Sequence, residues 1–287
     1  MKRVFYIFNF TFLLTGLYSC YTPRYVYSPS AINVPVFTKK GDSKLAANYS
    51  FNLAGNTVND SVPIKAKAHG YDLQAAWAFT NHWAMQANYS NRTERNTGDF
   101  NAGLRDSVVI NYKRNLTEIG VGYFHALNEN KQAIVQIFAG VGFGKSNFTD
   151  KGRDYNSGYR TRYHTMNITK LFIQPAFTVR SSKNFAATFS SRYSIIYFKN
   201  ISTDYNATEL SNYQLDSLGY SPRSFWEPAV INTFGFKKLP GIQFEFQAGI
   251  ALLMSRRFVD SRSFNFSAGL LFDLPKLFAA GHHSSKN

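Results

Sequence analysis

Residues 71–90, YDLQAAWAFTNHWAMQANYS, carry the clearest structural pattern of the chain. Its first half places an apolar side chain at every second position, with Tyr71, Leu73, Ala75, Trp77 and Phe79 on one face. After the short turn 81–82 the alternation resumes over 83–90. A period of two indicates a strand with one apolar and one polar face. The stretch therefore predicts two adjacent strands joined by a short turn.

The same alternation recurs along the rest of the chain and predicts ten strands. They cover residues 45–53, 71–79, 83–90, 115–126, 132–145, 164–180, 184–198, 225–236, 241–252 and 262–274. Short connections alternate with long polar ones at about 54–67, 91–113, 146–163, 199–224 and 253–261. Short periplasmic turns and long outer loops are typical of bacterial outer-membrane barrels. We predict an all-β, ten-stranded antiparallel up-and-down transmembrane β-barrel over residues 44–274, with eight to twelve strands possible.

Two features bear on this prediction. Pro175 and Pro228 fall inside predicted strands, where a closed barrel has no edge to tolerate a missing donor, so we expect bulges or shifted strand ends there. A soluble β-sandwich is the alternative reading of the aromatic-rich strands, whose chain is 17% Phe, Trp and Tyr. A sandwich does not predict the alternation of loop lengths.

The net charge of +15 indicates an anionic partner, either nucleic acid or a membrane surface. Basic residues are scattered among polar and aromatic ones, so we do not expect nucleic acid as a partner. Membrane lipid and lipopolysaccharide fit better as the anionic surface that such a chain meets. The single cysteine excludes an intrachain disulfide.

The N-terminus has the form of a secretory signal. Lys2 and Arg3 precede an apolar run over residues 4–17, and the run ends in LYSC, residues 17–20. This ending resembles the bacterial lipobox, which implies a signal peptide of residues 1–19, cleavage before Cys20, and lipidation of Cys20. An ordinary signal peptide with an incidental cysteine is the alternative. Several acyl chains would hold the N-terminus at a membrane almost irreversibly.

Three tracts resemble the outer-membrane β-barrel lipoproteins of Bacteroidota: AINVPVFTKKGD (31–42), DLQAAWAFT (72–80) and EPA (227–229). The resemblance implies that residues 20–43 form a lipidated periplasmic segment leading into the first strand. Residues 267–274, SAGLLFDL, resemble the C-terminal assembly signal of such barrels, and residues 275–287 form a tail.

The family implies barrel-assembly and lipoprotein-sorting machinery as partners, and it supplies no catalytic residues and no cofactor. Tyr21–Arg24 lack the acidic residues that often follow the cysteine of surface-exposed lipoproteins, which favours an anchor in the periplasmic leaflet of the outer membrane.

The alternation sends Asp72 and five further charged side chains into the barrel. We predict an interior charge network of these five: Glu118, Lys170, Arg192, Glu227 and Glu245. In a narrow barrel such charges would pair as a structural plug, and the alternative is a narrow polar pore. Glycines 120, 122, 140, 142 and 144 also face inward, and either leave a hollow or make room for large neighbours such as Phe124 and Phe138.

Enzymatic chemistry has little support in the sequence. His164 with Asp154 or Asp204 could form an outer-rim site acting on lipid A or peptides, but no tight motif accompanies it. His282-His283 is too sparse for a metal site, so we expect no metal and no cofactor. We predict a non-enzymatic structural or surface-binding role. The alternatives are a narrow diffusion channel and, third, an outer-membrane enzyme.

Overall fold

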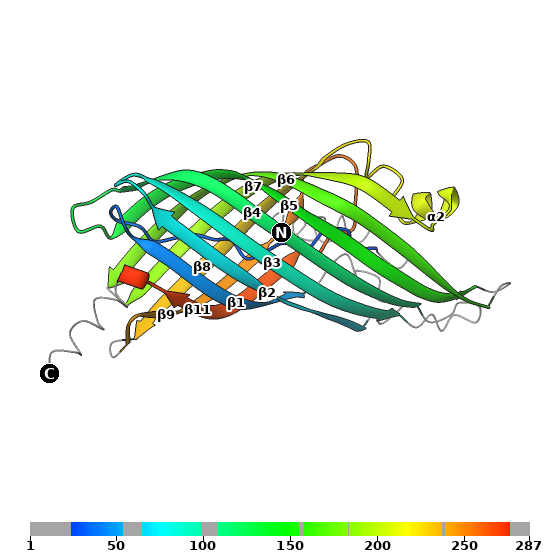
Figure 1. Ribbon diagram of the computed structural model, residues 1–287, viewed down its shortest axis with the longest axis horizontal. Helices are drawn as coiled ribbons and strands as arrows, with labels where there is room; N and C mark the ends of the chain where they lie inside the picture. Colours follow the sequence, from blue (N-terminus) through cyan, green and yellow to red (C-terminus); the bar gives the residue numbers. More distant parts are fainter. Residues whose placement is uncertain are drawn as a thin grey trace, which may run out of the picture.

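The computed structural model of the chain describes residues 24–53, 65–98, 108–154, 158–182, 184–236 and 239–275. They form a closed antiparallel β-barrel with one short helix, α2 (Ala207–Asn212), in the loop after β7 (Figure 1). The strands are β1 (Ser43–Leu53), β2 (Lys65–Ala78), β3 (Trp83–Gly98), β4 (Val108–Ala126), β5 (Ala133–Asp154), β6 (Gly158–Ser182), β7 (Phe185–Thr203), β8 (Arg223–Phe236), β9 (Leu239–Ile250), β10 (Leu252–Leu253) and β11 (Phe264–Phe272).

These elements make ten barrel strands, because β9 and β10 are one strand interrupted at Ala251. Leu252 faces Trp226 of β8 in the same register that places Gly249 opposite Ala229. Strands that follow one another in the chain pair with one another, and β1 pairs with β11 to close the barrel. The prediction of a ten-stranded up-and-down barrel is confirmed.

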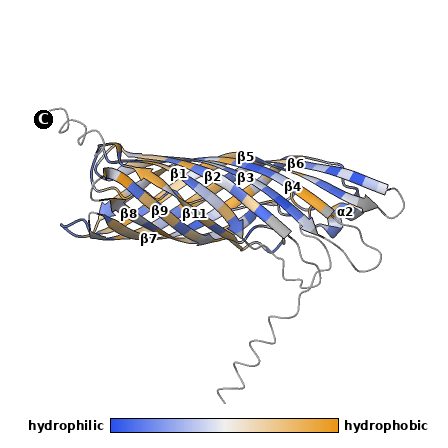
Figure 2. Ribbon diagram, turned by 90° about the horizontal axis from the view of Figure 1, so that it is seen from below, coloured by the Kyte–Doolittle hydropathy of each residue, from blue (hydrophilic) through white to orange (hydrophobic). Residues whose placement is uncertain are grey.

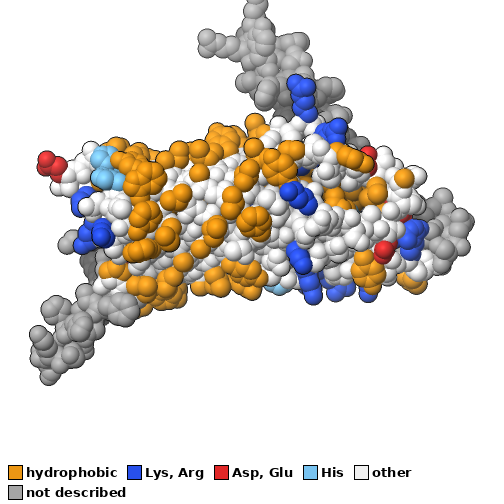
Figure 3. Space-filling model, turned by 45° about the horizontal axis from the view of Figure 1, so that its top comes forward, with side chains coloured by type: hydrophobic (Ala, Val, Ile, Leu, Met, Phe, Trp, Pro, Cys, Tyr) orange, Lys and Arg blue, Asp and Glu red, His pale blue; other side chains and the backbone are white. Residues whose placement is uncertain are grey.

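Successive residues of each strand alternate between the outside and the inside of the barrel. Leu73 and Val121 point outward and are 48% and 50% exposed, whereas Asp72 and Glu118 point inward and are 0% and 2% exposed. Hydrophobic and hydrophilic residues alternate along the strands (Figure 2), and on the surface a broad band of apolar side chains is flanked by Lys and Arg side chains toward its two ends (Figure 3). An apolar exterior around a polar interior is the organisation of a transmembrane barrel.

The two ends of the barrel differ. The short connections lie at one end, on the left of Figure 1, which we call the turn end. At the opposite loop end, strands β3 to β7 run on well beyond the predicted positions. Much of the predicted loops 91–113 and 146–163 is therefore strand, and that part of the prediction is wrong. Outward residues there are polar, as at Asn91 and Thr93, so the apolar alternation stops while the backbone ladder continues.

The two prolines do not cause the expected bulges. Pro175 faces Ile137 and Pro228 faces Ser191, and the register is the same on both sides of each proline. The register shifts of the described strands lie elsewhere, for example between Arg180 and Ser182 beside a short turn. The expected bulges are absent, but strand pairing is interrupted at both prolines: the β6–β7 pairs stop at Ile173 and resume at Ala176, and β9 ends at Ile250, which this register places opposite Pro228. The expectation of a shifted strand end is therefore confirmed at Pro228.

The loop over residues 204–222 packs against the loop end. Asn206 caps α2 in a capping box with Glu209, whose carboxylate also lies 3.2 Å from Arg160 and 3.3 Å from Arg162 on β6. Leu215 and Leu218 are buried in the largest apolar cluster of the described residues. Those contacts fix the loop to the barrel rim. No helix in the described ranges is long and apolar enough to cross a membrane.

Candidate functional site

A segment of the chain runs inside the barrel. Residues 24–37, which we call the lumen strap, precede β1, and most of their side chains are buried. The strap begins among the loops of the loop end and finishes beside the short turn at residues 79–82. The prediction that residues 20–43 form a periplasmic segment is wrong for the strap, which lies in the lumen. The predicted signal peptide and Cys20 lie outside the described residues.

Arg24 holds the loop end of the strap. Its Nε donates to Asp150 Oδ2 at 3.0 Å and to the Tyr205 hydroxyl at 3.2 Å, and its guanidinium lies 4.0 Å from the centre of the Tyr213 ring. Its backbone N donates to Asp260 Oδ2 at 3.2 Å. The strap is thereby joined to β5 and to two loops of the loop end.

Tyr205 completes this contact as a neutral phenol. Burial raises the pKa of Tyr205 far above its ordinary value, so the hydroxyl keeps its proton at physiological pH. It donates that proton to Asp150 Oδ2 at 2.7 Å. The Asp150 carboxylate therefore accepts from both Arg24 and Tyr205.

A second ion cluster surrounds Tyr25. Glu94 lies between two guanidiniums: Arg114 Nη1 is 3.0 Å from Glu94 Oε2, and Arg262 Nε is 3.1 Å from Glu94 Oε1. Arg262 also covers the Tyr25 ring at 4.0 Å, and Arg114 Nη2 donates to the Tyr25 carbonyl at 2.5 Å. The strap at Tyr25 is thus enclosed by a carboxylate on β3 and by two guanidiniums, one on β4 and one just before β11.

The middle of the strap is bound through its backbone. Gln247 accepts from the Ile32 N–H at 2.7 Å and donates to the Ile32 carbonyl at 3.0 Å. Gln174 donates to the Asn33 carbonyl at 2.8 Å. Asp72 accepts from the Ala31 N–H at 3.2 Å and pairs with Arg92 at 2.8 Å. The wall supplies side-chain partners for an extended peptide that has no neighbouring strand at this point.

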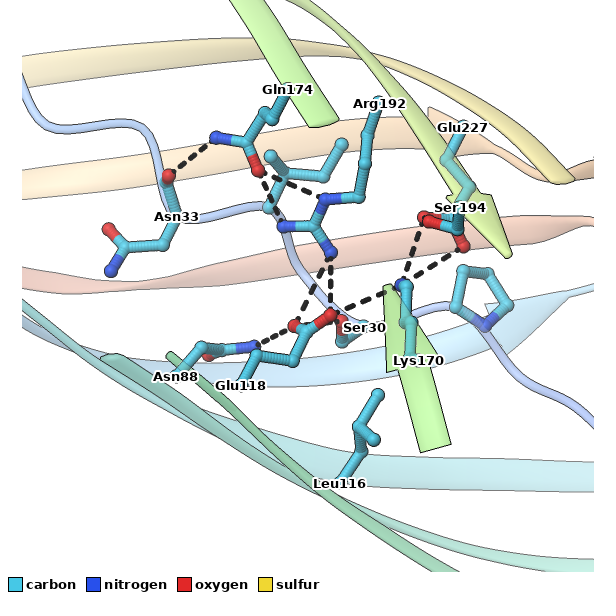
Figure 4. Close-up of polar contacts among 12 residues, drawn as sticks. Ser30, Asn33, Asn88, Leu116, Glu118, Lys170, Gln174, Arg192, Ser194 and Glu227 are labelled. Carbon is cyan, nitrogen blue, oxygen red and sulfur yellow. Dashed lines mark hydrogen bonds and ion pairs between the residues drawn. The ribbon is translucent and has the colours of Figure 1, made fainter. Parts of the chain in front are cut away.

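Four of the five residues of the predicted charge network lie together beside the strap (Figure 4). Glu118 is 3.2 Å from Lys170 and 3.2 Å from Arg192, and Lys170 is 3.1 Å from Glu227. All four are nearly fully buried. The structure does not bring the fifth member, Glu245, to this cluster. Glu245 pairs with Lys44 at 2.6 Å, nearer the start of β1.

The strap takes part in this central cluster. Ser30 donates to Glu118 Oε2 at 3.2 Å, and the Tyr27 hydroxyl donates to Glu227. Lys170 donates to the Tyr27 oxygen at 2.9 Å. Charged wall residues and strap residues therefore satisfy one another in one buried network.

Toward the turn end the lumen also holds an apolar cluster. Phe37 of the strap packs against Phe124 with ring centres 5.7 Å apart, and both belong to a buried cluster that includes Phe138. A Cβ on Gly122 would lie 2.4 Å from the Phe138 ring, and one on Gly140 would lie 2.6 Å from the Phe172 ring. These two inward glycines thus make room for large side chains.

The structure does not pair His164 with Asp204 in the predicted rim site. His164 is fully buried, with its ring 4.8 Å from that of Phe148. Asp204 instead accepts from the Tyr163 N–H at 3.1 Å, and the Asp154 side chain lies outside the described part. In the described ranges, no three His, Cys, Asp or Glu residues are grouped so as to hold a metal ion.

The sequence analysis did not predict the strap, which begins at Arg24, or the five ionic residues around its loop end: Glu94, Arg114, Asp150, Asp260 and Arg262. A signal was available. Residues 25–38 contain no charged side chain, which is unusual for a connecting segment exposed to water.

No protein-family model and no curated protein matches the chain. Among solved structures, an outer membrane channel from Pseudomonas putida F1 has a TM-score of 0.40 at 9% identity, over 84% of this chain and 99% of that chain. OprG from Pseudomonas aeruginosa has 0.35 at 8%, over 83% and 98%. Ail of Yersinia pestis has 0.31 at 12%, over 81% and 99%. These likenesses concern the fold alone.

Proposed function

We propose that this protein is an outer-membrane β-barrel whose lumen is closed to diffusion, and that its role is structural or surface-binding rather than enzymatic. The observation that carries the proposal is the lumen strap. Wall side chains bond it at the loop end through Arg24, in the middle through Ile32 and Asn33, and Phe37 packs into the apolar cluster at the turn end.

Opening a pore would require the strap to leave these partners. A ten-stranded barrel is narrow, and inward side chains take up most of its interior. Withdrawal of the strap would leave Gln247, Gln174 and Asp72 without the strap groups they bond. Each buried polar group that loses its partner costs about 1–3 kcal/mol. The closed arrangement is therefore the stable one.

Conductance in planar lipid bilayers tests the closed lumen. We expect no stepwise current from the full-length protein, and discrete current steps from a variant lacking residues 24–37. Heat-dependent migration on a detergent gel shows in each case that the inserted protein is a folded barrel. Ohmic steps from the full-length protein would contradict the proposal and support the narrow diffusion channel.

The outer wall supports lipopolysaccharide as the surface partner. Lys67 on β2 faces Arg95 on β3, and Lys113 on β4 lies diagonally next to Arg95, all exposed on the outside. We call these three residues the exterior basic cluster. Cross-strand and diagonal neighbours lie about 5–8 Å apart, a spacing that suits the phosphates of one headgroup.

Nothing acidic on the described part of these strands neutralises the cluster from outside. The acidic residues there are Asp72, Glu94 and Glu118, and all three are buried in the lumen. The cluster lies toward the loop end of the apolar band. Phosphates of lipid A would stand at that level if the loops face the cell exterior.

Binding of purified lipopolysaccharide to the detergent-solubilised barrel tests this partner. We expect the triple change Lys67→Gln, Arg95→Gln and Lys113→Gln to weaken binding, and dephosphorylated lipid A to bind both proteins equally poorly. The matched control removes three exposed charges from the turn end, Lys39→Gln, Lys40→Gln and Lys131→Gln, and should bind normally. Equal loss in both triples would mean that only net charge matters.

Lipidation of Cys20, the signal peptide 1–19 and the Bacteroidota relationship remain predictions from the sequence. Growth with an alkynyl fatty acid, followed by coupling to a fluorophore, tests the anchor. We expect labelled full-length protein and no label after Cys20→Ala.

A further inference from the structure

We infer that the chain preceding the strap leaves the barrel through the loop end, so that a lipid on Cys20 enters the leaflet on the loop side and not the periplasmic leaflet. The position of the lipid rests on the proposed lipidation of Cys20. The direction of the chain does not, because it follows from the described residues of the strap.

The two ends of the strap fix its direction. Arg24 lies among loop-end residues, bonded to Asp150 near the end of β5 and to Asp260 in the loop before β11. After Phe37, the Lys40 N–H donates to Asn81 Oδ1 at 2.9 Å, and Gly41 N–H donates to the Ala78 carbonyl at 2.8 Å. The chain therefore enters the lumen at the loop end and reaches the turn end only where β1 begins.

The reach of the chain excludes an anchor at the turn end. Cys20 is four residues before Arg24. Four residues span at most about 14 Å even when fully extended. The fourteen residues of the strap span up to about 50 Å from one end of the lumen to the other. Residues 20–23 are thus too few to return to the turn end.

Arg24 itself is not free to slide toward the turn end. Its guanidinium is bonded to Asp150 and Tyr205 and lies over the Tyr213 ring, and the residue is only 2% exposed. Behind it the lumen is filled by the Glu94 cluster around Tyr25. A buried arginine that lost its carboxylate would be strongly destabilising. The first described residue is therefore a fixed point at the loop end.

The consequence is an anchor in the leaflet that the outer loops adjoin. The composition after Cys20 favoured the periplasmic leaflet, because Tyr21–Arg24 contain no acidic residue. The strap direction favours the opposite leaflet, and it does so through chain connectivity rather than through a sorting preference. The lipid and the loops would then lie on one side of the membrane and the short turns on the other.

Labelling of single introduced cysteines on intact cells with a membrane-impermeant maleimide tests the inference. Thr22→Cys reports the residue next to the strap, Tyr220→Cys reports the loop end, where Tyr220 is 85% exposed, and Lys131→Cys reports a short turn. We expect Thr22→Cys and Tyr220→Cys to react before the outer membrane is permeabilised, and Lys131→Cys only afterwards. Reaction of Thr22→Cys together with Lys131→Cys would overturn the inference.

Two backgrounds separate this result from lipidation. In the parent background a lipidated Cys20 has no free thiol, and fatty-acid labelling reports its modification. In a Cys20→Ala background the Thr22→Cys probe reports the chain direction alone. If the parent protein takes up no fatty-acid label but Thr22→Cys still reacts on intact cells, the proposed lipidation is contradicted and the inferred chain direction stands. If the parent protein is labelled with fatty acid but Thr22→Cys reacts only after permeabilisation, as Lys131→Cys does, lipidation stands and the inferred chain direction is contradicted.

Discussion

Arg92 and Arg95 lie three residues apart on β3 and occupy opposite environments. Arg92 points into the lumen, pairs with Asp72 at 2.8 Å and donates to Asn52 at 3.0 Å. Arg95 points outward beside Lys67, and the carboxylates of the described parts of β2, β3 and β4 face away from it. Arginine on one face of the wall is therefore part of a buried ion pair, and on the other face it is an exposed surface charge.

The difference is one of partners and solvent. Removing one member of a buried ion pair leaves an uncompensated charge and costs about 3–5 kcal/mol. An exposed charge is screened by water and salt, and its pairs contribute about 0–1 kcal/mol. Mutations of the inward charges should therefore lower the stability strongly and leave surface binding unchanged. Mutations of the outward charges should weaken surface binding and leave the stability nearly unchanged.

The largest effect is expected for Glu118→Gln, which removes the carboxylate shared by Lys170 and Arg192. We expect the free energy of unfolding to fall by about 3 kcal/mol or more, because both cations remain buried. Urea unfolding in lipid vesicles, followed by tryptophan fluorescence, measures it. Lys113→Gln, five residues away on the outer face of β4, is the matched control and should leave the midpoint unchanged.

A smaller loss is expected for Gln247→Leu, which leaves the N–H and the carbonyl of Ile32 without their side-chain partner. Two buried unpaired groups should cost about 2–4 kcal/mol together. The strap should also become more accessible to added protease. The control is Gln243→Leu, which makes the same substitution four residues nearer the turn end on the same face of β9. Equal protease sensitivity of the two variants would contradict the contact assigned to Gln247.

The double change Glu118→Gln with Lys170→Met tests whether these two buried charges stabilise the protein as a pair. If the two groups act as a pair, the double variant should be more stable than the sum of the single losses predicts, by about 1–2 kcal/mol. The four-variant cycle of unfolding free energies measures this coupling. Additive losses would mean that Arg192 and Glu227 compensate each charge independently.

The smallest effect on stability is expected for the exterior basic cluster. Changing Lys67, Arg95 and Lys113 to glutamine should alter the free energy of unfolding by no more than about 0.5 kcal/mol per site. The same urea titration measures it. A loss as large as that of Glu118→Gln would show that these charges have structural partners in the folded protein.

The strands were predictable because burial on one face only imposes a period of two, as in Tyr71–Phe79. Their loop-end extensions were not, because above the apolar band both faces are polar and hydropathy no longer alternates. On β3 the inward Arg92 and Glu94 are as polar as the outward Thr93 and Arg95. Backbone hydrogen bonds between strands extend these elements without a sequence pattern.

The charge network was partly predictable for the same reason. The alternation along each strand places Glu118, Lys170, Arg192 and Glu227 on the inward face. It does not give their position along the barrel axis, so it could not show that Glu245 lies apart from the cluster and pairs with Lys44. Periodicity does not identify the strap, because it applies to strands in a sheet, and residues 24–37 are an extended peptide whose partners, such as Gln247 and Glu118, lie far away in the sequence. The absence of charge over residues 25–38 is the one signal that the sequence carries for it.

The strap also constrains the order of assembly. It lies inside a ring whose last joint is the pairing of β1 with β11, nine residues long from Leu45–Phe272 to Leu53–Phe264. A peptide with the loop-end network already formed around it cannot be inserted sideways through a finished wall. Pairing of the C-terminal strand with β1 closes the ring around the strap, so after closure the wall blocks every sideways route for this segment. Once sealed, the N-terminal segment can leave only end-on, by reptation along the axis.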